Sequence, residues 1–340
     1  MGGDLAPKVN TDGAVDFLAE HKDVVLVLAG PEETVRKSVE SYADQAKLQQ
    51  VVQRIEYLDA PEVITTEEHP VNALRRKKRS GIVLGMEMVH DGQADGFVSA
   101  GSTGAIMFGG MAKVKMIKGI ARPALGALLP VPKRPMLLVD SGANVDCKPE
   151  WIEQFAVMGS IYMNRVLHVE KPEVGLLNIG TEEAKGNQQT QAAYALLARQ
   201  PSICFSGNVE ARDALSAKCD VLTADGFAAN ILLKTVEGTM STLFGMLKEA
   251  MMSTTKGKIA GLLCKDTFRQ LKHSFDASEA GGAPLLGVEG IVIKAHGNSN
   301  ARAIFCALRQ AYEMQKADIV GQIRAGLGES VFKEEREETK

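Results

Sequence analysis

The sequence predicts an α/β fold in which a mostly parallel β-sheet is flanked by helices. Short apolar runs recur along the chain, and each is followed by a turn rich in glycine, asparagine or aspartate and then by a stretch of helical pattern. The runs contain few polar residues, which is typical of strands buried on both faces of a parallel sheet. The 340 residues are enough for one such domain with a substantial core.

Six expected strands enter polar turns. They are residues 24–29 before Gly30, 96–99 before 101–104, 136–140 before 141–144, 174–178 before 179–181, 202–206 before 207–208, and 221–224 before 225–226. Ligands of open α/β sheets bind beyond the carboxyl ends of the strands. We therefore expect the site among these turns.

Composition excludes several classes of protein. Hydrophobic residues make up 45% and charged residues 24%, as in soluble globular proteins, and no apolar run approaches the roughly 20 residues of a membrane-spanning helix. No signal peptide is evident at the start. A net charge of -3 and 5% aromatic residues argue against a nucleic-acid partner. The five cysteines form no CxxC pair, which indicates reduced cytoplasmic thiols and no metal site.

We interpret residues 1–340 as a single catalytic domain with two additions. Residues 238–278 have helical pattern on both sides of residues 253–257, which predicts an inserted helical hairpin that projects from the sheet domain. Residues 329–340 form a charged tail.

Two of the polar turns are candidates for binding phosphate. Ser102 and Thr103 follow a strand, where backbone N–H groups at a helix start can hold an anion. Asp140 and Asn144 can position a ligand after the next strand. The structural alternative in both cases is an ordinary turn, which these residue types favour. No histidine or second carboxylate lies at a spacing that would make a metal site there.

The run from Asn178 to Asn187 is the most informative. Lys185 and Asn187 follow a strand end within a short polar loop, where a lysine can neutralise phosphate and amides can donate hydrogen bonds. The spacing of a P-loop is absent. The alternative is a solvated helix N-terminus with acidic residues in its first turn.

Two further turns repeat the pattern. Asp225 precedes Asn230 at a helix start, and His296 follows the apolar run of residues 290–293. A lone histidine is more often a hydrogen-bonded core residue than a catalytic one, so the role of His296 depends on the residues around it.

Five consecutive cations form a separate candidate. A solvated helix end is the simple interpretation, and a docking patch for an acidic protein is the functional one. The residues are Arg75, Arg76, Lys77, Lys78 and Arg79.

Taken together, the motifs resemble one family over nearly the whole chain. They are residues 1–4 (MGGD), 99–105 (SAGSTGA), 140–149 (DSGANVDCKP), 175–187 (GLLNIGTEEAKGN), 207–212 (GNVEAR), 225–230 with 233–235, 281–287 (GGAPLLG) and 294–299 (KAHGNS). Their order and spacing look like the phosphate acyltransferases of bacterial phospholipid synthesis.

That resemblance implies an activity, partners and a fold. Such enzymes transfer a fatty acyl group from acyl carrier protein to inorganic phosphate, and a membrane acyltransferase then passes it to glycerol 3-phosphate. The resemblance implies a fold similar to isopropylmalate dehydrogenase and phosphotransacetylase, a homodimer, and peripheral contact with an anionic cytoplasmic membrane surface through the hairpin. No cofactor is expected, because phosphopantetheine arrives on the carrier protein.

Two departures from the family pattern stand out. Family members carry a short strand before the Met-Gly-Gly-Asp motif, and this sequence begins inside the motif, which leaves either a late start or an incomplete central strand. Ala184 stands where the family usually has glycine, which would restrict the loop if that position needs positive φ.

The hypothesis for the chemistry is direct attack of phosphate on the thioester. Lys185 would stabilise charge, Asn187, Asn208 and Asn230 would donate from their amides, and His296 would protonate the leaving sulfur or orient phosphate. Phosphate and substrate would contact Ser102, Thr103, Asp140, Asn144, Asn178, Asn208 and Asp225. Cys147 has no basic partner adjacent in the sequence, which argues against an acyl-enzyme.

The hairpin carries its own prediction. Ile259, Leu262 and Leu263 lie between lysines, a composition that suits an anionic membrane surface, although a buried dimer contact would also explain it. The rival functions are a phosphotransacylase-like enzyme that uses acyl-CoA, a nicotinamide-dependent dehydrogenase, and a non-catalytic scaffold that binds carrier protein or membrane.

Overall fold

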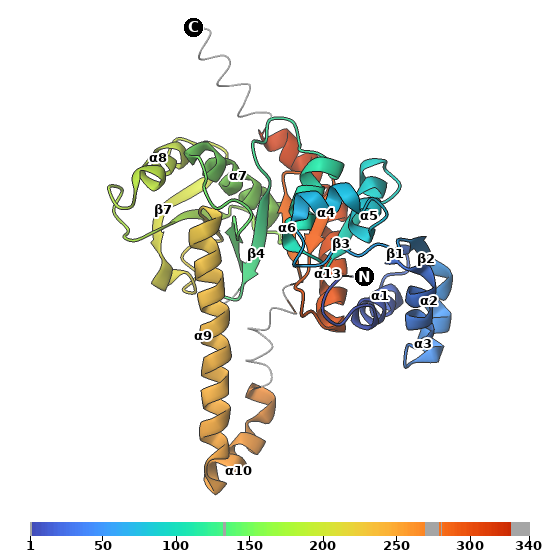
Figure 1. Cartoon of the computed structure of the whole chain (residues 1–340). Coiled ribbons are helices and arrows are strands. Elements are labelled where there is room, and N and C mark those ends of the chain that lie inside the picture. Colours follow the sequence, from blue (N-terminus) through green and yellow to red (C-terminus); the bar gives the residue numbers. More distant parts are fainter. Residues whose placement is uncertain (1, 132–133, 269–278, 280, 328–340) are drawn as a thin grey trace.

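The computed structural model describes residues 2–131, 134–268, 279 and 281–327 (Figure 1). The strands are β1 (Leu26–Gly30), β2 (Ile55–Asp59), β3 (Gly96–Ser99), β4 (Ala124–Leu129), β5 (Met136–Val139), β6 (Glu173–Asn178), β7 (Cys204–Glu210), β8 (Val221–Thr223), β9 (Ala283–Leu286) and β10 (Ile291–Lys294). The α-helices are α1 (Lys8–Glu20), α2 (Glu32–Glu40), α3 (Gln45–Val51), α4 (Pro70–Arg76), α5 (Gly81–His90), α6 (Thr103–Gly109), α7 (Pro149–Arg165), α8 (Gln188–Leu197), α9 (Gly226–Met252), α10 (Thr255–Leu263) and α13 (Ala301–Lys316).

The predicted α/β class is confirmed. The main sheet has the order β3-β10-β9-β4-β5-β8-β6-β7, with helices on both sides, and β1 and β2 pair in parallel in a sheet of their own. Every residue of β5 and β8 is buried, which explains their unbroken apolar sequences. Phe155, Met158 and Tyr162 of α7 are also buried in the main hydrophobic cluster, together with residues of β5 and β6.

The strands fall into two groups that run in opposite directions. β3 pairs in parallel with β10, and β5, β8, β6 and β7 pair in parallel with one another. Between these groups, the pairings β10–β9, β9–β4 and β4–β5 are all antiparallel. Three reversals mean that the carboxyl ends of the two groups do not share one sheet edge.

One predicted turn is part of a strand. Residues 207–208 were expected to end a strand, but β7 continues to Glu210. The pairing with β6 shifts register between Val174 and Gly175, and Gly207 has φ 97°. The pairing passes over Ser206, which is the extra residue of a β-bulge, so the strand continues through Gly207.

The longest helix, α9, leaves the body of the molecule as a rod, and α10 turns back beside it (Figure 1). α9 begins at Gly226, before the expected hairpin start at residue 238, and Thr254 caps α10 by accepting a hydrogen bond from Gly257 N. Residues 269–278 of the hairpin and the charged tail 329–340 lie outside the described residues. Within the described ranges, no helix combines the length and apolar character needed to cross a membrane.

Candidate active site

Three of the glycine-containing segments meet through their backbones. Asp4 N donates to Gly297 O at 2.7 Å, and a Cβ at Gly3 would lie 2.9 Å from the same oxygen. A Cβ at Gly2 would lie 2.7 Å from the nitrogen of Gly101. Only glycine permits backbone contacts this close, so these residues bring the start of the chain against the loops after β3 and β10.

The loop after β5 is organised around one buried carboxylate. Asp140 accepts hydrogen bonds from the backbone nitrogens of Leu125, Gly142, Ala143 and Asn144 and from the Asn144 amide. Asn144 also donates to Pro123 O at 2.8 Å. These hydrogen bonds therefore determine the conformation of the loop. This agrees with the alternative that Asp140 and Asn144 are residues of an ordinary turn.

The same loop holds the start of α9. Asn144 O accepts from Gly226 N at 2.7 Å, and a Cβ at Gly142 would lie 3.4 Å from Asn230. Asp225 caps the helix by accepting from Ala228 N at 2.9 Å. The sequence candidates from residues 140–144 and 225–230 thus form one unit.

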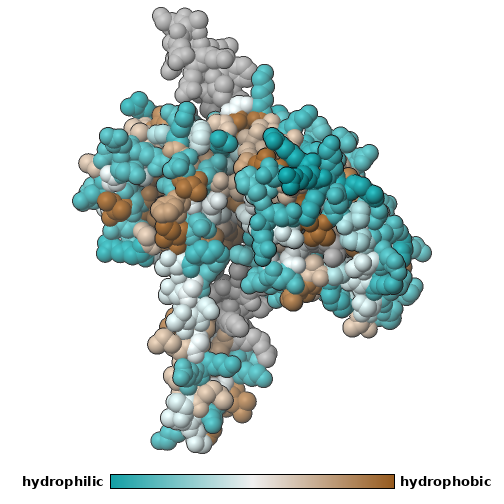
Figure 2. All heavy atoms as spheres, viewed as in Figure 1, coloured by the Kyte–Doolittle hydropathy of each residue, from teal (hydrophilic) through white to brown (hydrophobic). Residues whose placement is uncertain are grey.

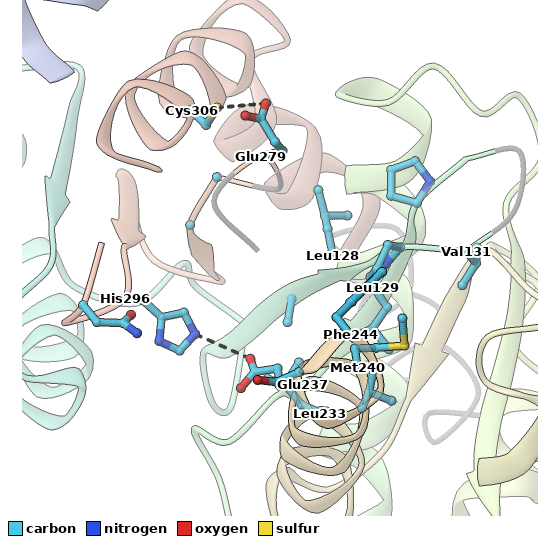
Figure 3. A pocket seen from close by; sticks show the side chains of 18 of the residues that line it. Leu128, Leu129, Val131, Leu233, Glu237, Met240, Phe244, Glu279, His296 and Cys306 are labelled. Carbon is cyan, nitrogen blue, oxygen red and sulfur yellow. Dashed lines mark hydrogen bonds and ion pairs between the residues drawn. The ribbon is translucent and has the colours of Figure 1, made fainter. Parts of the chain in front are cut away.

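A large cavity of about 2150 Å³ lies between the two strand groups, against β4 and α9. Its polar lining comes from both groups and includes Thr103, Ser141, Asn230, Lys234, Glu237, Lys294, His296 and Asn298. Its apolar lining includes Leu128, Leu129, Val131, Leu233, Met240 and Phe244. Figure 3 shows His296 facing Glu237, with Met240 and Phe244 further along the same helix and the β4 leucines beside them.

A charged cluster lines the polar part. Glu237 contacts Lys234 Nζ at 2.7 Å and His296 Nε2 at 3.6 Å (Figure 3). The contact with His296, together with that to Lys234, lowers the pKa of Glu237 to about 2, although burial opposes this. Burial, followed by repulsion from Lys234, lowers the pKa of Lys294. The cavity wall therefore carries the ionised carboxylate of Glu237 among the basic side chains of Lys234, Lys294 and His296.

The Lys185 loop lies outside this cavity. Asn178 donates to Lys185 O at 3.2 Å and to Asn208 Oδ1 at 3.1 Å, and Asn208 donates to Glu182 O at 2.8 Å. These two buried side-chain amides fix the backbone of the loop by hydrogen bonds. Lys185 itself is exposed, and Asn187 caps α8 by accepting from Thr190 N at 2.9 Å.

Ala184 does not need the freedom of glycine. It is absent from the non-glycine residues with positive φ, whereas Gly186 has φ 92°. A Cβ at Gly186 would lie 2.6 Å from Asn178 Oδ1. The left-handed position of this loop is therefore Gly186, and the alanine is compatible with it.

The remaining candidates lie as follows. Ser102 caps α6 by accepting from Ala105 N at 3.5 Å. In the basic run, Lys77 pairs with Glu68 and Arg79 with Asp59, while the other three side chains are exposed. Burial raises the pKa of the Cys147 thiol to about 12, so it is not a thiolate near neutral pH.

Glu237 and Lys294 were not among the residues singled out from the sequence. One signal was available for Glu237, because residues 230, 234 and 237 share one face of a helix at spacings of four and three. No sequence signal singles out Lys294, since a lysine at the end of an apolar strand is usually solvated.

Comparison with known proteins identifies the family. A family model described as "Fatty acid synthesis protein" matches residues 1–322. The chain belongs to this family. The chain is 45% identical to a phosphate acyltransferase of Clostridium botulinum and 44% identical to one of Clostridium tetani, each over 96% of both chains. The family and these relatives make the chain an acyltransferase.

Two solved structures have a fold similar to that of this chain. A phosphotransacetylase from Streptococcus pyogenes is similar with a TM-score of 0.58 at 18% identity, covering 91% of each chain. A branched-chain phosphotransacylase from Enterococcus faecalis is similar with a TM-score of 0.51 at 13% identity, covering 92% of this chain and 97% of the other. At these identities the likeness concerns the fold alone.

Proposed function

We propose that this acyltransferase moves a fatty acyl group from the thioester of acyl carrier protein to inorganic phosphate, forming an acyl phosphate for phospholipid synthesis. The relatives that cover 96% of the chain are named phosphate acyltransferases. The observation that carries the acyl half is the cavity, because a polar region with Asn230, Lys294 and His296 continues into an apolar wall.

The apolar wall is long enough for a fatty chain. The α9 residues that line the cavity extend from Asn230 to Met252, a rise of about 33 Å at roughly 1.5 Å per residue. An extended chain of about 16 carbons with bonds of about 1.5 Å spans roughly 20 Å. Each methylene removed from water contributes about 0.8 kcal/mol, so this wall supplies affinity for long chains.

The reaction needs no covalent enzyme intermediate. A phosphate oxygen attacks the thioester carbonyl, a C–O bond forms, and the C–S bond breaks with its electron pair leaving on sulfur. A proton converts the thiolate to the free thiol. Thr103 and Asn230 line the cavity where phosphate would bind, whereas Lys185 is exposed on a loop outside the cavity lining.

The test is incubation with long-chain acyl carrier protein in the presence and absence of phosphate. We expect phosphate-dependent release of free thiol together with an equal amount of acyl phosphate, detected as a hydroxamate after quenching. Acyl-CoA in place of acyl carrier protein distinguishes the alternative phosphotransacylase. Thiol release that does not depend on phosphate, or an acyl-enzyme trapped by hydroxylamine without phosphate, would contradict the proposal.

A further inference from the structure

Glu237 does not cap either end of its helix, α9. It lies in the fourth turn of α9, far from both helix ends, and its side chain is one-third exposed at the cavity wall. Its carboxylate oxygens are divided between two partners, with Oε2 on Lys234 and Oε1 on His296 Nε2. A single carboxylate therefore links α9 to the loop that follows β10.

The surroundings of His296 include charges from three segments. Lys234 and Glu237 approach from α9, and Lys294 precedes the histidine by two residues at the end of β10. Asp4 of the N-terminal segment lies beside Gly297. Of these groups, only Glu237 makes a contact with the His296 ring among the described residues.

We propose that Glu237 is a positioning residue for acyl transfer, whose carboxylate orients the His296 imidazole through Nε2 and leaves Nδ1 to exchange a proton with the substrate. This inference rests on the proposed function. It assigns the proton of the last step: Nδ1 of the imidazolium donates to the departing sulfur, which becomes a thiol, and the neutral imidazole regains a proton from solvent.

The expected effect of Glu237 has a definite sign. An anion beside an imidazole favours the protonated form of the ring. Glu237 stays ionised through the working range, because its pKa is about 2. Removing that charge takes away this support for the protonated imidazole, which is the form that donates to sulfur.

The direct measurement is a histidine NMR spectrum of the full-length protein. The chain has six histidines, and a His296→Asn variant identifies the signals of interest. In Glu237→Gln we expect the ring signals of His296 to shift, because the carboxylate no longer lies against Nε2. Glu249→Gln, an exposed change on the same helix, serves as the matched control and should leave these signals in place.

The kinetic measurement is the pH profile of kcat. We expect the alkaline decline to begin at lower pH in Glu237→Gln, to return partly toward the wild-type position in Glu237→Asp, and to vanish in His296→Asn. A merely structural role would lower kcat equally at every pH. Unchanged ring signals of His296 in Glu237→Gln would overturn the inference, whatever the enzyme's substrate. Shifted signals without phosphate-dependent activity in the wild type would instead reject the proposed function.

Discussion

Lys185 lies on a loop whose backbone is held firmly while its ammonium remains exposed. The buried amides of Asn178 and Asn208 bind the backbone oxygens of Lys185 and Glu182. A Cβ at Gly180 would lie 2.8 Å from Lys185 Cγ, so the missing side chain of that glycine makes room for the lysine stem. A backbone held in place by hydrogen bonds, with the ammonium group exposed, suits a lysine that binds a charged substrate.

We expect Lys185→Ala to lower acyl phosphate formation by at least about 100-fold, the usual loss when a donor to a developing oxyanion is removed. Thermal stability should stay close to that of the wild type, because the ammonium makes no ion pair within the described residues. Lys171→Ala, an exposed lysine before β6, is the matched control. Near-normal turnover of Lys185→Ala in the phosphate-dependent assay would remove this residue from the chemistry.

The helices α9 and α10 carry most of the large hydrophobic side chains that are exposed within the described residues. Eight of the thirteen belong to these two helices, with Ile259 57%, Leu262 73% and Leu263 81% exposed. Figure 2 shows pale and brown surface on this projection, against a largely hydrophilic body. Such a concentration favours contact with a membrane or another protein copy.

We propose that this tip binds an anionic membrane, with Lys256, Lys258 and Lys265 beside the apolar residues. A triple Ile259→Ser, Leu262→Ser, Leu263→Ser variant should lose at least tenfold in flotation with vesicles containing anionic lipid. Val25→Ser, at an exposed site in the body, should float like the wild type. If the triple variant floats normally but elutes as a smaller species, the tip is a dimer contact.

On the scale of the whole molecule, the basic run lies near the site. Pro70 begins α4, and a Cβ at Gly104 would lie 2.5 Å from Pro70 Cγ, so α4 packs on the helix that follows Ser102. Arg75 is about 7.5 Å further along α4 at roughly 1.5 Å per residue. Arg75, Arg76 and Lys78 are exposed and have no ion pair among the described residues.

We propose that these three side chains dock the acidic carrier protein. Changing all three to glutamate should raise KM for acyl carrier protein by at least tenfold, and less so at high salt, where charges are screened. Turnover of an acyl-CoA, if it is accepted, should change little. Glutamates at Lys22, Lys118 and Lys171 make an equal charge change elsewhere, and an equal loss there would contradict docking at the run.

Much of the fold followed from local pattern. The strands β3, β5, β6 and β10 lie within a residue or two of the apolar runs that predict them. Several loops were also predicted as sites, and the structure brings Thr103, Asn230 and His296 to one cavity. Apolar runs and strand-end glycines are local features, so the sequence shows them directly.

Local sequence patterns are therefore enough to predict the α/β class, the strand-end loops and, through the motifs, the family. Strand direction is visible only in the folded chain, because three antiparallel pairings between β10 and β5 depend on contacts between distant segments. The same holds for Glu237 and His296, which are 59 residues apart in the chain and 3.6 Å apart in space. A charged side chain on a helix becomes a site residue only through the partner that folding brings to it.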